Sequence, residues 1–268
     1  MCFVIKTKHL LPLALFSALL WSCQDLDSSP KALVNILLID APAKWDSVVV
    51  EIQGVELEFV PNSRQGGDVQ RIFLPYELGN KQVDISRFVG GRSLPVARNE
   101  MQLGVITGIT LRLGTGNSLY LNKEKFPLEL PDGKIDYFQS LNIDLEQGIS
   151  YDIVLDFDLA KSIQVTGSNP LALKFNPTIA AFSGFGKGEL TGTTSPTEIR
   201  PVIYAIKGTD SLSTHTNSGG NFLFRLEPGD YTVFIDPKDS RYNANTILNV
   251  KVEQGKKTPL ERITLTRK

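Results

Sequence analysis

Three aspartates separated by even numbers of residues are the side chains whose pattern most directly suggests chemistry. Asp152, Asp156 and Asp158 alternate with apolar residues in one short run. In a β-strand such residues share one face, and neighbours on that face lie about 6.6–7 Å apart because each residue rises ~3.3–3.4 Å. Carboxylate oxygens are the ligands that Ca²⁺ prefers. Asp40, at the end of another apolar run, is a candidate fourth ligand, so the sequence allows a calcium site here.

A structural role for these carboxylates is the interpretation that we prefer. We expect Asp156 and Asp158 to accept hydrogen bonds from backbone donors of the turn at Asp40–Pro42, because such charge-assisted bonds are stronger than neutral ones. Pairing with a cation such as Lys161 is a second structural alternative. A carboxylate pair that hydrolyses a glycosidic bond is the remaining one. On the preferred interpretation the protein needs no cofactor.

Other catalytic side chains are scarce. The chain has two cysteines, Cys2 and Cys23, and two histidines, His9 and His215. These numbers exclude a disulfide scaffold and a cysteine-rich zinc site, and they leave no set of histidines for metal binding. The 28 basic side chains nearly balance the 29 acidic ones, which argues against a nucleic-acid partner. We therefore expect a protein that is not an enzyme.

Aromatic side chains offer one route to ligand binding. Trp45, together with Tyr76, Tyr120 and Tyr137, presents flat rings on which sugars stack. The alternative that we prefer is that Trp45 covers the edge of a β-sandwich beside Pro42.

The N-terminal residues have the pattern of a secretory leader. Basic Lys6 and Lys8 precede the apolar run Leu10–Trp21, which is shorter than the roughly 20 residues that a membrane-spanning helix needs. The run ends in Leu20-Trp21-Ser22-Cys23, which resembles the lipobox of bacterial lipoproteins. An ordinary signal peptide and an uncleaved anchor helix are the alternatives.

The lipobox resemblance implies that Cys23 becomes acylated, with palmitate-type chains, and that residues 1–22 are removed. Buried acyl chains supply membrane affinity at ~0.8 kcal/mol per CH₂, so no spanning helix is required. The following acidic residues, Gln24–Ser29, resemble the signal that sends Bacteroidetes-type lipoproteins to the surface of the outer membrane. We therefore expect a lipid-anchored envelope protein.

Apolar residues of the remaining chain recur with period two, which is typical of half-buried antiparallel strands. Turn-forming residues separate these runs, and only 83–89 favours a short helical turn. We expect strands at Leu33–Ile39, Ser47–Phe59, Val69–Leu74, Val105–Leu113, Phe138–Leu145, Tyr151–Leu159, Leu171–Phe182, Glu189–Gly192, Val202–Ile206, Asn221–Leu226, Tyr231–Ile235, Thr246–Val252 and Ile263–Leu265. The fold class is all-β.

The glycine-rich segment Ser183–Gly188 favours a flexible joint between two domains. The sequence before it resembles a secreted family known as domain of unknown function 4382. Three motifs carry this resemblance: Leu37-Leu38-Ile39-Asp40-Ala41-Pro42, Leu155-Asp156-Phe157-Asp158-Leu159-Ala160-Lys161-Ser162-Ile163 and Leu173-Lys174-Phe175-Asn176-Pro177-Thr178-Ile179. That family has no established activity, so the resemblance implies a fold and no chemistry.

The sequence after the joint is similar to the carboxypeptidase regulatory-like, transthyretin-type β-sandwich. The motifs are Gly188-Glu189-Leu190-Thr191-Gly192, Asn217-Ser218-Gly219-Gly220-Asn221-Phe222 and Leu226-Glu227-Pro228-Gly229-Asp230-Tyr231-Thr232-Val233. The resemblance implies a turn at Gly229 with positive φ. It also implies that the Tyr231 hydroxyl bonds to backbone, as in a tyrosine corner.

These patterns predict a signal peptide at 1–22, a tether at 23–31 and two antiparallel Greek-key sandwiches of the immunoglobulin or transthyretin type, at 32–183 and 184–268. The function that we expect is a non-catalytic binding or structural module for a glycan, a peptide or an envelope protein. An adhesin-like component that assembles through strand edges is the alternative, and a carboxylate-based hydrolase is the third.

Overall fold

The computed structural model describes residues 29–40, 45–62, 67–168 and 171–268. Residues Lys31–Lys268 form one compact unit. The predicted leader and the acylation site Cys23 lie outside the described residues. In the part of the chain that is described, no helix is long and apolar enough to cross a membrane.

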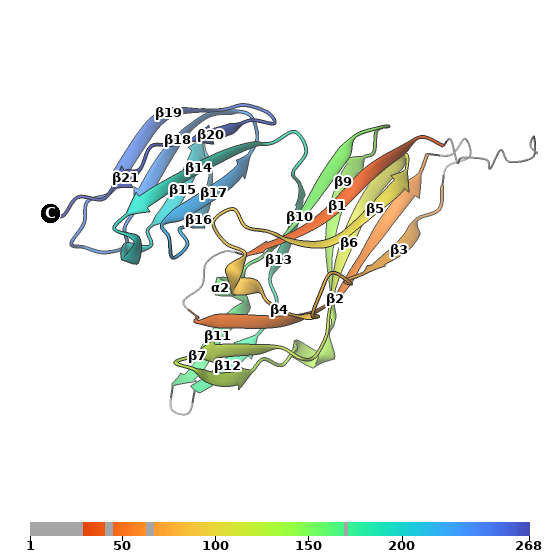
Figure 1. Ribbon diagram of the computed structural model, residues 1–268, viewed down its shortest axis with the longest axis horizontal. Helices are drawn as coiled ribbons and strands as arrows, with labels where there is room; N and C mark the ends of the chain where they lie inside the picture. The colour runs from red at the N-terminus through yellow and green to blue at the C-terminus, as the bar shows by residue number, and fades with distance from the viewer. Residues whose placement is uncertain (1–28, 41–44, 63–66, 169–170) are drawn as a thin grey trace, which may run out of the picture. The chain divides into compact units, whose positions relative to one another are not determined.

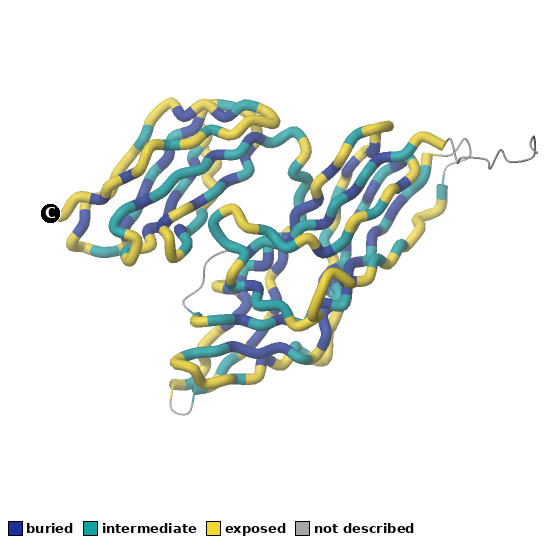
Figure 2. Tube along the Cα trace, in the orientation of Figure 1, coloured by how far each residue is buried: buried dark blue, intermediate teal, exposed yellow. Residues whose placement is uncertain are grey.

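The described chain is almost entirely β-structure, as the period-two pattern predicts (Figure 1). Buried and solvent-facing residues alternate along most strands (Figure 2). The buried apolar side chains form two separate clusters. The first core contains residues between Ala32 and Ile179, and the second core contains residues between Leu190 and Leu265.

The strands around the first core make two main sheets and a small hairpin. They are β1 (Lys31–Asp40), β2 (Ser47–Pro61), β3 (Gln70–Pro75), β4 (Gln82–Asp84), β5 (Leu94–Gln102), β6 (Gly104–Leu113), β7 (Ser118–Leu121), β8 (Glu124–Pro127), β9 (Asp136–Asp144), β10 (Ser150–Phe157), β11 (Ile163–Ser168), β12 (Leu171–Phe175) and β13 (Ile179–Ser183). One sheet has the order β13-β10-β1-β5, and the other has the order β8-β7-β2-β6-β9 with β3 and β4 also on β2. The helical turns are η2 (Ile85–Arg87), η3 (Pro131–Gly133) and α2 (Leu159–Ser162).

The long strand β2 organises the second of these sheets. Its first residues pair with β4 and β7, and its later residues pair with β3 and β6. The register shifts between Ile52 and Gly54. At Gly54, where φ is +152°, a Cβ atom would lie 2.8 Å from Cα of Pro75 in β3. Only glycine combines this backbone conformation with so close a neighbour.

The first sheet contains a parallel pair. Strands β1 and β10 run parallel, with Ile39 beside Asp156 and Asp40 beside Phe157. The ends of both strands therefore meet at one edge of the sheet, with Asp40 on its buried face and Asp156 on the opposite face.

Two facing sheets surround the second core. Their strands are β14 (Gly188–Ser195), β15 (Val202–Lys207), β16 (Asp210–His215), β17 (Asn221–Leu226), β18 (Gly229–Asp236), β19 (Asn245–Val252), β20 (Lys257–Pro259) and β21 (Ile263–Thr264), with a turn η4 (Thr197–Ile199). One sheet has the order β17-β14-β20 with β21 on β14, and the other has the order β16-β15-β18-β19.

Two predicted strands differ from the structure for identifiable reasons. The run Leu171–Phe182 is two strands, because Asn176–Thr178 form no ladder there and Pro177 has no N–H to donate. The strand in the run Tyr151–Leu159 ends at Phe157, because Asp158 caps the turn α2, which begins at Leu159. Strand β5 is absent from the prediction because Pro95 and four charged or amide side chains obscure its period.

The glycine-rich joint lies against the first core. The N–H of Gly184 donates to the carbonyl oxygen of Asp152 at 2.7 Å. The ring of Phe185 lies 4.9 Å from the ring of Tyr151, measured between centroids. The division of the chain into independent domains at 183/184 stays a prediction.

Candidate binding site

Asp40 and Asp158 fix the turn that follows β10. Asp158 is the N-cap of α2, and its Oδ1 accepts a hydrogen bond from the N–H of Lys161 at 2.9 Å. Its Oδ2 lies 2.7 Å from Nζ of Lys161. Asp40 is buried, and its Oδ1 accepts from the N–H of Leu159 at 3.2 Å. Both carboxylates therefore serve the backbone of one turn.

Asp156 lies in the same place without such a bond. Its Oδ1 is buried and has no hydrogen-bond partner within the described residues. Burial, and then the nearby charge of Asp158, raises the pKa of Asp156 to about 6. The carboxyl group is therefore harder to ionise than an exposed aspartate.

Asp152 is separated from the other three. It is exposed, and its Oδ1 accepts from Nδ2 of Asn35 at 2.8 Å. Asp156 thus lies near Asp158, whose charge acts on it, whereas Asp40 is on the opposite, buried face of the sheet and Asp152 is four residues back along β10. Within the described residues, no cluster of three or more metal-ligating side chains is present. A role for calcium stays untested.

Gly229 and Tyr231 form a compact corner at the start of β18. Gly229 has φ +150°. The hydroxyl of Tyr231 donates to the carbonyl oxygen of Glu227 at 2.8 Å. This geometry is that of a tyrosine corner, and both residues stabilise the chain reversal between β17 and β18.

A large concave surface is the cavity of about 880 Å³ beside Trp45, which we call the Trp45 cavity. It is lined by Trp45, Ala160, Ile163, Val165, Glu198, Ile199, Arg200, Val202, His215, Thr216, Pro237, Lys238, Asp239 and Arg241. Its volume is within the range of small-molecule sites.

Apolar side chains make up much of its wall. Trp45 packs against the first core and also faces the cavity. Val165 in β11 is 53% exposed, although it is a large β-branched residue. An exposed apolar wall beside an aromatic ring is the usual form of a ligand site.

Two neutral polar groups lie in the same cavity. Thr216 is fully buried, and its Oγ1 has no hydrogen-bond partner in the described part of the chain. His215, the residue before it, is half-buried, and burial lowers its pKa despite the opposing effect of Asp158. Its imidazole is therefore neutral at pH 7 and able to donate or accept a hydrogen bond.

The charged groups at the rim mostly pair with one another. Arg241 forms a bidentate ion pair with Asp239, with an Nη2–Oδ2 distance of 2.7 Å. Lys238 pairs with Asp236. Of the charged lining residues described, Glu198 and Arg200 form no ion pair. Arg200 also has a left-handed backbone, with φ 45°, a conformation that costs on the order of 1 kcal/mol outside glycine.

The predicted aromatic group does not assemble around Trp45. Tyr76 and Tyr137 are buried in the first core. Tyr120 lies in β7 with Lys125 over its ring. Period-two patterning could not reveal the true neighbours of Trp45, because His215 and Thr216 lie about 170 positions further along the chain. Only the folded chain brings them together.

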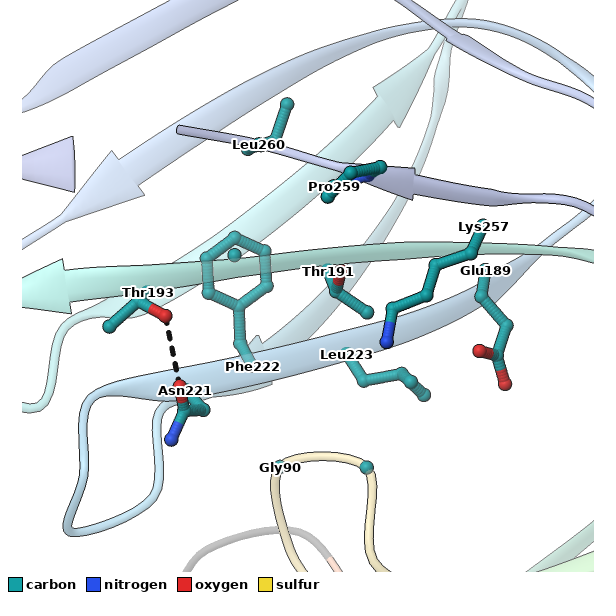
Figure 3. Close-up of a pocket in the computed structure, with 12 residues that line it drawn as sticks. Gly90, Glu189, Thr191, Thr193, Asn221, Phe222, Leu223, Lys257, Pro259 and Leu260 are labelled. Carbon is teal, nitrogen blue, oxygen red and sulfur yellow. Dashed lines mark hydrogen bonds between the residues drawn. The ribbon is translucent and has the colours of Figure 1, made fainter. Parts of the chain in front are cut away.

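A second, shallower pocket of about 450 Å³ lies over β14, β17 and β20 (Figure 3). Thr191 and Thr193 of β14 point into it, and Oγ1 of Thr193 donates to Asn221 at 2.9 Å. The Gly90–Gly91 turn also lines it. Thr193 and Asn221 bond to each other, and Phe222, the aromatic residue among the described lining residues, is buried, so the Trp45 cavity is the stronger candidate.

Comparisons with solved structures give weak similarity to two bacterial proteins. The minor pilin GBS52 of Streptococcus agalactiae is 11% identical, with 87% of this chain and 96% of that chain covered and a TM-score of 0.23. The Bacillus anthracis TIE protein is 11% identical, with 98% of this chain covered and a TM-score of 0.25. This chain spans 45% of that protein. TM-scores this low carry no argument about fold or function.

No curated protein matches the chain. A family model does match it, over residues 31–174. The match contains β1–β11 and nearly all of β12, and it includes the turn that Asp40 and Asp158 hold together. The chain therefore belongs to the family described as domain of unknown function DUF4382.

Proposed function

We propose that this protein is a non-catalytic, lipid-anchored component of the bacterial cell envelope that binds a neutral glycan in the Trp45 cavity. The lipobox-like sequence ending at Cys23 supports the anchor and a place at the outer membrane. The cavity supports the binding role. Residues 184–268 contribute one wall of it, as an accessory sandwich of the transthyretin type.

The single observation that carries the proposal is the combination of Trp45 with a buried, unpartnered hydroxyl of Thr216 in one cavity. A sugar ring has an apolar face that stacks on an indole, and its hydroxyl groups form hydrogen bonds at its edge. A buried polar group without a partner is costly. Thr216 Oγ1 is covered in this structure, so a ligand hydroxyl forms this bond only when the atoms over it move aside. The neutral imidazole of His215 provides a second such partner.

The charge balance of the rim favours a neutral ligand. Arg241 and Lys238 are already paired with aspartates. The cavity therefore offers little net charge to attract a charged ligand. Glu198 and Arg200 add one charge of each sign.

A glycan array with the full-length protein tests the proposal. We expect neutral oligosaccharides to bind, and we expect Trp45→Ala and Thr216→Val to weaken that binding at least tenfold. Thr246→Val is the matched control, because Thr246 is exposed on β19 and does not line the cavity. Thermal melts of each variant separate loss of binding from loss of fold. Binding that survives both cavity variants, or no glycan bound at all, would contradict the proposal.

Assembly through strand edges is the second candidate. Strand β19 is an edge of its sheet, and Leu248 on it is 65% exposed. An exposed edge strand offers unpaired backbone groups to a partner strand. Sedimentation of the protein, alone and with Leu248→Lys, tests this. Concentration-dependent association that the variant abolishes would favour assembly.

A further inference from the structure

A third cavity is lined by two charged side chains, each of which has one buried atom without a hydrogen-bond partner in the described part of the chain. This cavity, of about 250 Å³, is lined by residues that include Asp156 and Arg225. Oδ1 of Asp156 and Nη1 of Arg225 are both buried, and neither has a hydrogen-bond partner within the described residues. We call it the Asp156–Arg225 cavity.

Asp156 forms no ion pair within the described residues. The charge of Lys161 lowers the pKa of Asp156, but Nζ of Lys161 lies 2.7 Å from Oδ2 of Asp158 and pairs with that carboxylate. Lys187 also lines the cavity, but its Nζ lies 3.7 Å from Glu227 and 4.6 Å from the ring centre of Phe182. Asp156 therefore lines the cavity, and no cation among the described residues forms an ion pair with it.

Arg225 is only partly satisfied. Its side chain is 16% exposed, and its Nη2 lies 3.5 Å from the carboxylate of Glu189. A guanidinium group carries five N–H donors. The donors on Nη1 of Arg225 have no hydrogen-bond acceptor among the described residues. Removing one partner from a buried charge costs several kcal/mol in other proteins, so both groups favour a ligand that supplies the missing charge.

The cavity also has backbone groups available for recognition. Leu212, Ser213 and Thr214 of β16 line it. Strand β16 is an edge of its sheet, so alternate N–H and C=O groups along it are not used in the ladder. A volume of about 250 Å³ equals that of roughly eight liquid waters, at about 30 Å³ each, which is enough for an amino acid or a dipeptide.

We propose that the Asp156–Arg225 cavity binds a small zwitterion of the amino-acid or short-peptide class, with its ammonium group at Asp156 and its carboxylate at Arg225. One cation and one anion on the same molecule satisfy both buried groups at once. This site is independent of the glycan site, because the two cavities share no lining residue.

Isothermal titration calorimetry of the full chain tests the proposal with glycine and diglycine as probes. The two probes distinguish a free amino acid from a peptide by the separation of their charges. Methylammonium and acetate each carry one of the two charges, and we expect each to bind at least tenfold more weakly than the better zwitterion. Asp156→Asn and Arg225→Gln should each reduce zwitterion affinity at least tenfold. Asp152→Asn, an exposed aspartate on the same strand, should leave it unchanged.

Three results would overturn the proposal. Neither glycine nor diglycine binds at millimolar concentration, acetate binds as tightly as the zwitterions, or the two variants bind like the wild type. Mutual pairing of Asp156 and Arg225 in solution is the fourth contrary outcome. It would appear as a coupling between the two substitutions in a double-mutant cycle of unfolding, measured without ligand.

Discussion

The carboxylate of Asp40 accepts a hydrogen bond from the backbone N–H of Leu159, 119 positions later in the chain, at 3.2 Å. Asp40 ends β1, and Leu159 begins the turn that follows β10. The bond therefore joins the ends of the two parallel strands at the centre of their sheet. It also places the turn α2 next to Asp156, which lies at the same edge.

Replacing Asp40 with alanine tests this bond. The N–H of Leu159 would lose its partner in a buried position, which costs about 1–3 kcal/mol. Urea unfolding of Asp40→Ala should show this loss, and Asp152→Ala, at an exposed site, should show much less. Equal midpoints for wild type and Asp40→Ala would mean that the bond contributes nothing.

Asp156 makes stability depend on pH in a defined direction. Burial raises its pKa in the folded state to about 6, above the ordinary value of an aspartate, so the folded state holds this proton more tightly than the unfolded chain. The free energy of unfolding contributed by this group is therefore highest below pH 4 and falls as pH rises through 6. Asp156→Asn should remove that fall. Between pH 4 and pH 8 the free energy of unfolding of the variant should rise relative to that of the wild type by on the order of 3 kcal/mol. Unfolding curves that shift in parallel for both proteins across this range would refute the assignment.

The corner at Tyr231 makes a separate prediction. Tyr231→Phe removes the 2.8 Å bond to the Glu227 carbonyl and should lower stability by about 0.5–1.5 kcal/mol. Tyr120→Phe is the matched control, because the Tyr120 hydroxyl makes no hydrogen bond with the described residues. Chemical denaturation with both variants measures the difference, and similar losses in the two would argue against the corner.

Acylation at Cys23 makes the fourth prediction. Cys23→Ser removes the sulfur that the lipobox resemblance assigns to lipid, so acyl labelling and detergent-phase partitioning should both disappear. Metabolic labelling with a palmitate analogue, followed by phase separation, measures this. A variant that keeps its label and stays in the detergent phase would show that the anchor lies elsewhere.

The sequence predicts much of the fold because period-two patterning records burial directly. In β1 every second residue is buried, from Ala32 to Asp40, and the prediction Leu33–Ile39 lies within it. Strand β17 matches its predicted bounds. Patterning fails where other forces decide, as at Pro177, which interrupts a run that otherwise alternates, and at Asp158, whose side chain caps a helical turn after β10.

The candidate sites depend on contacts that no local pattern records. Even spacing places Asp152 and Asp156 on one face, but whether a carboxylate finds a donor depends on the neighbouring strand. Asn35 of β1 reaches Asp152, whereas Ile39 of β1 lies beside Asp156. Likewise Trp45 is conspicuous in the sequence. Thr216, which lines the same cavity, lies in the part of the chain that surrounds the second core.

The most direct test of the glycan proposal is the fluorescence of Trp45 itself. Trp21→Phe leaves Trp45 as the single tryptophan of the chain, so emission reports only on the cavity. Adding a glycan that the array identifies should shift the emission saturably and reduce quenching of Trp45 by acrylamide at least twofold. Thr216→Val should raise the glycan concentration needed for half-saturation at least tenfold. Saturable glycan binding that leaves both the emission and the quenching of Trp45 unchanged would place the ligand elsewhere and contradict the account.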